Sequence, residues 1–236
     1  MPLKLAHDIF SGLLDLIYPP FCLVCAKPGE EALCAKCVEK IDLVGRVYCH
    51  TCGTPCEDYE CAECHSRVFA FEYARSAGIF EGVLRDAIHR LKYDSRLTLA
   101  DPLAELMVRC FPDTLLPGKI DIVIPIPIHR SRLPERGFNQ ARELAVRFGK
   151  RVRLPVMTDV LVKTKKTRHQ VELARDERGI NLEGVFAVTN ADKVVGKRVL
   201  LIDDVFTTGS TLHEAATSLR EAGAKAVYAY TLARSV

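Results

Sequence analysis

The sequence lacks a long uninterrupted apolar run, and it lacks the marks of a secretory signal. A membrane-spanning helix needs about 18 or more consecutive apolar residues, and no segment of the 236-residue sequence approaches that length. The apolar N-terminal series is broken by His7, Asp8 and Asp15, without the basic start and cleavage site of a signal peptide. We therefore expect no membrane span and a cytoplasmic, reducing location.

The net charge is small, and aromatic side chains are few. The formal net charge of +3 is too small to indicate a polyanion partner, but basic residues crowd residues 129–178, which suits phosphate groups. A channel for single-stranded nucleic acid usually adds aromatic stacking platforms, and this stretch holds only Phe138 and Phe148. The pattern favours a phosphate ligand and supports direct binding of single-stranded nucleic acid only weakly.

Three segments differ in pattern. Residues 1–20 space their apolar side chains as an amphipathic helix does. Residues 21–68 hold nine of the ten cysteines, and residues 71–236 alternate strand and helix patterns. We predict an N-terminal helix, a small cysteine-rich module and an α/β domain over these three ranges.

Eight of the cysteines form C-x-x-C pairs. They are Cys22/Cys25, Cys34/Cys37, Cys49/Cys52 and Cys61/Cys64. Two such pairs complete a tetrahedral Zn²⁺ site, and metal binding would supply much of the folding free energy of so small a module. Disulfides would need an oxidising compartment, and thioredoxin-type redox pairs usually occur singly. We predict two structural zinc ions, with an iron–sulfur cluster as the minor alternative.

The pairing of these cysteines into sites has two solutions. Sequential pairing joins the first two pairs in one site and the last two in another, while interleaved pairing gives a cross-brace. Each sequential site closes a short loop, which favours sequential pairing, but the interleaved solution stays open. Cys56 and Cys110 remain as bystanders.

The second part of the chain has the periodicity of an α/β domain. We expect helices over 83–91, 99–108, 138–149 and 211–222, and strands over 120–124, 194–203 and 227–232. Such alternation predicts a mostly parallel sheet with helices on both faces. Ligands of these sheets bind at the carboxyl ends of the strands, where two loops, after 120–124 and after 194–203, would meet.

The second loop combines two carboxylates with a run of hydroxyl residues. Asp203 and Asp204 end the strand, and the run that leads into the next helix is Thr207, Thr208, Gly209, Ser210 and Thr211. Backbone N–H groups and hydroxyls at a helix N-terminus can bind a phosphate. The aspartates can accept hydrogen bonds from vicinal ribose hydroxyls or help to hold Mg²⁺. A Walker B strand looks similar, but the Gly-x-x-x-x-Gly-Lys-Ser/Thr loop that it requires is absent.

Several further motifs follow one another in order. They are Leu91-Lys92-Tyr93, Pro125 and Pro127, Arg136-Gly137-Phe138-Asn139-Gln140, a loop with Arg168, Gln170, Arg178 and Asn181, and the Asp-Asp-Val-x-Thr-Thr-Gly motif. Together with the cysteine pairs, this set resembles the ComF family of type I phosphoribosyltransferase-like proteins over nearly the whole chain. The resemblance implies an α/β type I phosphoribosyltransferase fold preceded by a double zinc ribbon.

The resemblance also implies a ligand, 5-phosphoribosyl-1-pyrophosphate (PRPP), bound with Mg²⁺. Asp203 and Asp204 would hold the ribose hydroxyls, residues 207–211 the 5-phosphate, and Pro127 and Arg136 would face the pyrophosphate. Residues 165–178 resemble the mobile hood of amidophosphoribosyltransferases, and Arg168 would join the two aspartates as a catalytic residue.

Two function classes follow from this resemblance. The first is a phosphoribosyltransferase whose acceptor is unidentified, because no pocket motif for a purine or pyrimidine is recognisable. The second is a non-catalytic module that senses PRPP or binds nucleic acid and carries a structural zinc ribbon. Family membership implies a role in the handling of imported single-stranded DNA during competence, with that DNA and a competence helicase as partners.

Overall fold

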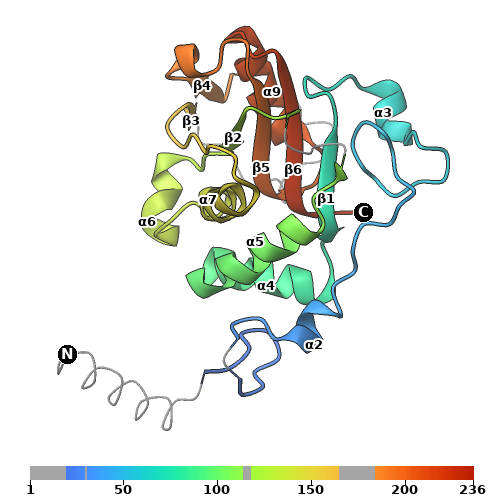
Figure 1. Ribbon diagram of the computed structural model, residues 1–236, viewed down its shortest axis with the longest axis vertical. Helices are drawn as coiled ribbons and strands as arrows, with labels where there is room; N and C mark the ends of the chain where they lie inside the picture. The colour runs from blue at the N-terminus through green and yellow to red at the C-terminus, as the bar shows by residue number, and fades with distance from the viewer. Residues whose placement is uncertain (1–19, 30, 114–117, 165–183) are drawn as a thin grey trace.

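The computed structural model describes residues 20–29, 31–113, 118–164 and 184–236. Its central element is a four-stranded parallel sheet in the order β1-β6-β5-β2 (Figure 1). The strands are β1 (Ala74–Ile79), β2 (Ile122–Pro125), β5 (Arg198–Phe206) and β6 (Ala226–Arg234). A smaller antiparallel pair joins β3 (Leu161–Lys163) to β4 (Phe186–Val188). The predicted mostly parallel sheet is confirmed.

Helices cover both faces of this sheet. The longer ones are α4 (Gly82–Tyr93), α5 (Ala100–Arg109), α7 (Gln140–Val152) and α9 (Ser210–Glu221). Alternate residues of β5 point to opposite faces, so Leu200 and Ile202 join a core with α4, α5 and α7, whereas Val199 and Leu201 join a core with α9 (Figure 1). We call these the α4/α5/α7 core and the α9 core. None of the helices in the described ranges is long and apolar enough to cross a membrane.

Short helical segments complete the described chain. They are α2 (Ala35–Val38), α3 (Ala62–Ser66), α6 (Leu133–Arg136) and 3₁₀ turns at Leu97–Leu99, Arg130–Arg132 and Ala191–Lys193. The segment with α2 lies against α4, and the segment with α3 lies beside β1 (Figure 1). The two halves of the cysteine-rich segment thus contact the α/β domain at different places.

The sequence-predicted elements correspond closely to the observed ones, with one shifted strand. The strand expected over 194–203 begins instead at Arg198, because Gly196 forms a turn with φ +70° and bonds to Gly223. It then continues to Phe206, so Asp203 and Asp204 belong to the strand itself. Strands β1, β3 and β4 were missing from the prediction. The helix predicted over residues 1–20 falls almost wholly outside the described residues.

Candidate functional site

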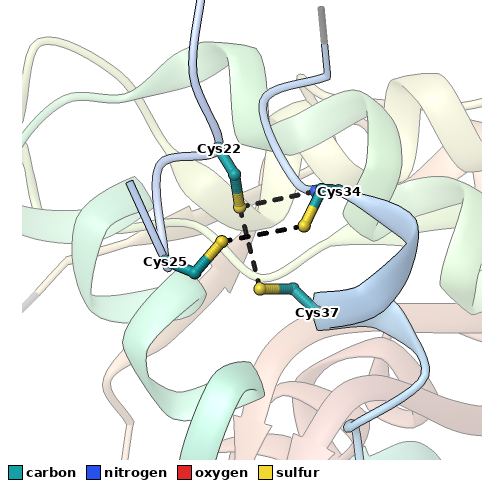
Figure 2. Close-up of side chains that lie close together, drawn as sticks. All are labelled: Cys22, Cys25, Cys34 and Cys37. Atoms are coloured by element: carbon teal, nitrogen blue, oxygen red, sulfur yellow. Dashed lines mark hydrogen bonds between the residues drawn. The ribbon is translucent and has the colours of Figure 1, made fainter. Parts of the chain in front are cut away.

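Four cysteines near the start of the described chain converge on one point. The first quartet is Cys22, Cys25, Cys34 and Cys37, whose sulfur atoms all lie within 4.8 Å of one another. The Sγ atoms are 3.7 Å apart in Cys22 and Cys37 and 3.8 Å apart in Cys25 and Cys34 (Figure 2). Tetrahedral Zn–S bonds of about 2.3 Å place sulfurs about 3.8 Å apart. The donor set therefore fits Zn²⁺.

A second group of four thiols repeats this arrangement. The second quartet is Cys49, Cys52, Cys61 and Cys64, again with all sulfurs within 4.8 Å, and the Sγ atoms of Cys52 and Cys61 are 3.5 Å apart. The quartets follow the sequential pairing, and Cys56 and Cys110 belong to neither. The interleaved alternative does not match this geometry.

The first cysteine of each quartet has a lowered pKa. Burial opposes ionisation of Cys22, but hydrogen bonds from backbone N–H groups, including that of Cys34, outweigh it and lower its pKa to about 6. Burial likewise opposes ionisation of Cys49, where N–H groups of the Cys52 and Cys61 backbone lower the pKa to about 6. The thiolate is the metal-binding form, so each quartet has a ready first ligand at neutral pH.

The hydroxyl turn, residues 207–211, joins the end of β5 to the first two residues of α9. Gly209 adopts φ +72° immediately before α9 begins at Ser210. A Cβ atom on Gly209 would come within 2.7 Å of the Phe206 ring, so glycine is required here. The Thr208 hydroxyl lies 3.0 Å from the Ser210 hydroxyl and accepts from the Ser210 N–H at 3.4 Å. Its hydroxyls and N–H groups can bind an anion at the N-terminus of α9.

Asp204 has one carboxylate oxygen in use and one without a partner. The Lys92 Nζ atom lies 2.9 Å from Asp204 Oδ1. The other oxygen, Oδ2, is buried and has no hydrogen-bond partner among the described residues. A buried acceptor without a partner costs free energy unless a ligand or water satisfies it.

The surroundings of Asp203 raise the pKa of its carboxyl group. Burial, and then the charge of Asp204, raise the pKa of Asp203 to about 7, although the charges of Lys92 and Lys163 act in the opposite direction. The Asp203 carboxylate also accepts the Asp204 N–H at 2.8 Å. A bound cation or hydroxyl donors at this position would favour the ionised form of Asp203.

The loop after β2 meets this edge of the sheet. Pro125 pairs with Ile202 in the parallel register, and the Ile126 N–H donates to the Ile202 carbonyl at 2.9 Å. Asn139 holds the loop through Ile126 and caps α7 by accepting from the N–H of Ala141. Pro127 follows in the same loop and is partly buried.

Of the two arginines in the predicted site, the structure describes Arg136 and does not describe Arg168. The Arg136 guanidinium lies over the Tyr93 ring, 5.2 Å from its centroid, which joins the Arg-Gly-Phe-Asn-Gln motif to the Leu-Lys-Tyr element. Arg168 and the rest of residues 165–178 lie outside the described residues.

Three cations were absent from the sequence-predicted site, although they lie near the hydroxyl turn or the acidic pair, which is Asp203 and Asp204. They are Lys92, Lys163 and Arg67. Lys92 had a signal, since it is the centre of the Leu-Lys-Tyr motif. Burial, and then the charge of Arg132, lower the pKa of Lys163. Arg67 reaches the turn from the cysteine-rich segment, which no local pattern could indicate.

Comparison with known families agrees with this geometry. A family model described as "Phosphoribosyl transferase domain" matches residues 93–235, and one described as "Double zinc ribbon domain" matches residues 13–68. The chain therefore has the type I phosphoribosyltransferase fold, preceded by a double zinc ribbon that supports structural zinc in both quartets.

Within that class, the chain belongs to the ComF family. It is 30% identical over 152 residues to competence protein F of Haemophilus influenzae, covering 63% of this chain and 66% of that protein. It is 30% identical over 162 residues to competence protein ComFC of Bacillus subtilis, covering 68% of this chain and 64% of that protein. DNA utilization protein YhgH of Escherichia coli is 30% identical over 159 residues, with 65% of this chain and 68% of that protein covered. The matches thus span about two thirds of the length of these relatives.

Solved structures with similar folds include two that differ widely in size. A glutamine PRPP amidotransferase from B. subtilis is 19% identical, with a TM-score of 0.40, and is covered over 30% of its chain and 61% of this one. A purine phosphoribosyltransferase from Pyrococcus horikoshii is 18% identical, with a TM-score of 0.32, and is covered over 82% of its chain and 58% of this one.

Proposed function

We propose that this chain binds PRPP with Mg²⁺ at the carboxyl end of β5, and that it does so in the handling of imported single-stranded DNA. The observation that carries the ligand proposal is the buried Asp204 carboxylate. Its Oδ2 atom has no partner among the described residues and lies just before the hydroxyl turn. A ribose hydroxyl is a donor of the right kind for that acceptor.

The proposed binding mode places each part of the ligand on a different group. The ribose hydroxyls donate to Asp203 and Asp204, and the 5-phosphate accepts from the N–H groups and hydroxyls of the hydroxyl turn. Mg²⁺ would be held mainly by the pyrophosphate and hydroxyls of the ligand, and it would neutralise the pyrophosphate charge. The proposed cation and hydroxyl donors would also favour the ionised form of Asp203, whose pKa is raised to about 7 by burial and by Asp204.

Lys92 supports the same assignment. It forms an ion pair with Asp204 at 2.9 Å and is itself largely buried. This contact fixes Oδ1 of Asp204 and leaves Oδ2 as the acceptor that a ribose hydroxyl can use. We assign Lys92 the role of holding Asp204 in place for the ribose.

The basic stretch contributes less to the site than its composition suggests. Arg147 and Arg151 are committed to ion pairs on the outer side of α5 and α7, with Asp101 and Glu105 among their partners. These pairs join two helices, so they are structural. The relatives named above are competence and DNA utilization proteins, and that similarity supports the proposed role in DNA handling. Single-stranded DNA and a competence helicase are the partners that we propose for it.

Titration calorimetry with PRPP and Mg²⁺ tests the proposal directly. We expect binding by the unmodified protein and a loss of about tenfold or more in Asp204→Asn, because one charge-assisted hydrogen bond contributes about 1.5–3 kcal/mol. Asp192→Asn is the matched control, since Asp192 is exposed and lies outside the site. Equal affinity in Asp204→Asn and the unmodified protein would contradict the ribose assignment.

The same preparations separate the two function classes. Release of pyrophosphate on addition of one of a panel of acceptors identifies a phosphoribosyltransferase. Tight binding of PRPP without such release identifies a binding module.

A further inference from the structure

The segment that leaves the second quartet runs directly onto the hydroxyl turn. Cys64 lies in α3, which ends at Ser66, and Arg67 is the next residue. The Arg67 guanidinium donates to the Thr208 carbonyl and to the Ser210 hydroxyl, both at 3.3 Å. A side chain three positions after a predicted zinc ligand therefore contacts both sides of Gly209.

An aromatic side chain packs against this arginine. The guanidinium lies over the Phe69 ring, 4.8 Å from its centroid, and Phe69 stacks on Phe71 at 4.7 Å. The Phe69 ring also lies where a Cβ atom on Gly209 would come within 3.0 Å. The Phe69 ring therefore packs against both the Arg67 guanidinium and the hydroxyl turn.

The backbone of the same segment is tied to α9. The Ala70 N–H donates to His213 Nδ1 at 3.0 Å, one turn into the helix. The charge of Arg67 reaches this histidine as well: burial, and then Arg67, lower the pKa of His213. The linker from the second quartet thus reaches Thr208, Gly209 and Ser210 of the hydroxyl turn, and His213 of α9.

We propose that Arg67 is a positioning residue of the hydroxyl turn, supplied by the second zinc quartet, and that phosphate affinity therefore depends on the second quartet but not on the first. The proposal rests on the proposed function, in which the hydroxyl turn binds the 5-phosphate. It adds a residue and a dependence that lie outside the phosphoribosyltransferase domain match, residues 93–235.

Two physical effects follow from the Arg67 contacts. The planar guanidinium can donate to the Thr208 carbonyl and the Ser210 hydroxyl at once, which fixes the turn in one shape, whereas a lysine offers a single ammonium group. Its positive charge also lies beside the proposed anion site, where it favours a phosphate dianion. Substitution by methionine removes both effects, and substitution by lysine removes only the first.

The experiment compares Arg67→Met and Arg67→Lys with a matched variant of the first quartet. Lys40 is the third residue after Cys37, as Arg67 is the third after Cys64, and it is exposed. Titration calorimetry measures the affinities for ribose 5-phosphate and for PRPP with Mg²⁺. Elemental analysis and melting temperatures without ligand show whether each variant keeps its zinc and its fold.

We expect Arg67→Met to bind both ligands about tenfold more weakly, Arg67→Lys to fall between it and the unmodified protein, and Lys40→Met to bind normally. Unchanged affinity in Arg67→Met, equal losses in Arg67→Met and Arg67→Lys, or an equal loss in Lys40→Met would overturn the proposal. A loss for PRPP alone would also overturn it, because the effect would then lie at the pyrophosphate. If the unmodified protein binds neither ligand, the proposed function itself fails.

Discussion

The two quartets have the same four thiols but stabilise different parts of the molecule. In the first, Cys22 and Cys37 are buried in the α4/α5/α7 core together with Leu33 and Ile41. In the second, Cys49 and Cys52 are buried in the α9 core, next to Phe69 and Phe71. The first quartet therefore anchors a helical face, while the second borders the hydroxyl turn.

The surroundings of the quartets also differ in charge. A Zn²⁺ ion bound by four thiolates has two negative charges in excess. In the described ranges, both buried arginines contact the backbone of the second quartet's segment: Arg75 donates to the His50 carbonyl, next to Cys49, and Arg234 donates to the Cys52 carbonyl. The first quartet has the exposed Cys25 instead, so water can screen part of its charge. The excess negative charge is thus screened partly by water at the first quartet and offset by buried arginines at the second.

The largest expected effect comes from removing one ligand of each quartet. Cys37→Ser and Cys64→Ser should each lower the zinc content from about two to about one and lower the melting temperature, because structural zinc supplies folding free energy. Only Cys64→Ser should also weaken the binding of ribose 5-phosphate, since only the second quartet holds Arg67. Elemental analysis, thermal unfolding and calorimetry measure the three quantities.

Cys56→Ser is the control, because Cys56 lies outside both quartets. It should keep both metals and normal affinity. Equal losses of affinity in Cys37→Ser and Cys64→Ser would remove the difference between the quartets.

Whether the sequence predicts a contact at the quartets depends on how far apart the two contacting residues are along the chain. The C-x-x-C spacing and the short loops predict both quartets, because their ligands are near neighbours in the chain. The Arg67 contact to Thr208 spans 141 positions, and the Arg234 contact to Cys52 spans 182. No periodicity or motif links residues so far apart, so the role of the second quartet becomes visible only in three dimensions.

The α/β domain shows the same limit. The hydroxyl turn and the acidic pair are local patterns, and they were predicted at the correct strand. β1 was not predicted, because Ala-Arg-Ser-Ala-Gly-Ile has few β-branched residues, and it forms through pairing with β6. Asp204 was named as a candidate site residue from the sequence, but its ion pair with Lys92 could not be predicted, because that contact needs α4 to end beside β5.

A smaller effect is expected at the buried arginine of β6. Arg234 donates to the Cys52 carbonyl at 2.7 Å and to the Thr54 hydroxyl at 2.5 Å, and that hydroxyl lies 2.9 Å from Cys52 Sγ. Outer contacts of this kind typically change metal affinity by about 10–100-fold. Arg234→Met should therefore speed the release of one zinc ion of the two to a chelator, as followed with a zinc-sensitive dye.

Arg109→Met is the matched variant on the side of the first quartet. Arg109 is exposed at the end of α5 and lines a groove shared with Ala35 and Val38 of α2. Its release kinetics should equal those of the unmodified protein. Faster release of both ions in Arg234→Met would mean that the arginine stabilises the whole fold instead of one quartet.

The smallest effect concerns the histidine that ties the second quartet to α9. His213 accepts the Ala70 N–H through Nδ1, so that nitrogen must be unprotonated. Burial, and then the charge of Arg67, lower the pKa of His213 in the folded protein below its usual value of about 6.5. As pH falls below about 6.5, the unfolded chain takes up this proton before the folded one, so the stability that the histidine contributes above that pH is progressively lost. One proton limits the slope to about 1.4 kcal/mol per pH unit, and partial exposure makes the effect smaller.

His213→Gln keeps an acceptor but cannot titrate, so its melting temperature should fall less than that of the unmodified protein between pH 7.5 and pH 5.5, at equal zinc content. His89→Gln, on the exposed side of α4, should follow the unmodified protein. Identical pH profiles for His213→Gln and the unmodified protein would show that protonation of this histidine does not loosen the link between the second quartet and α9.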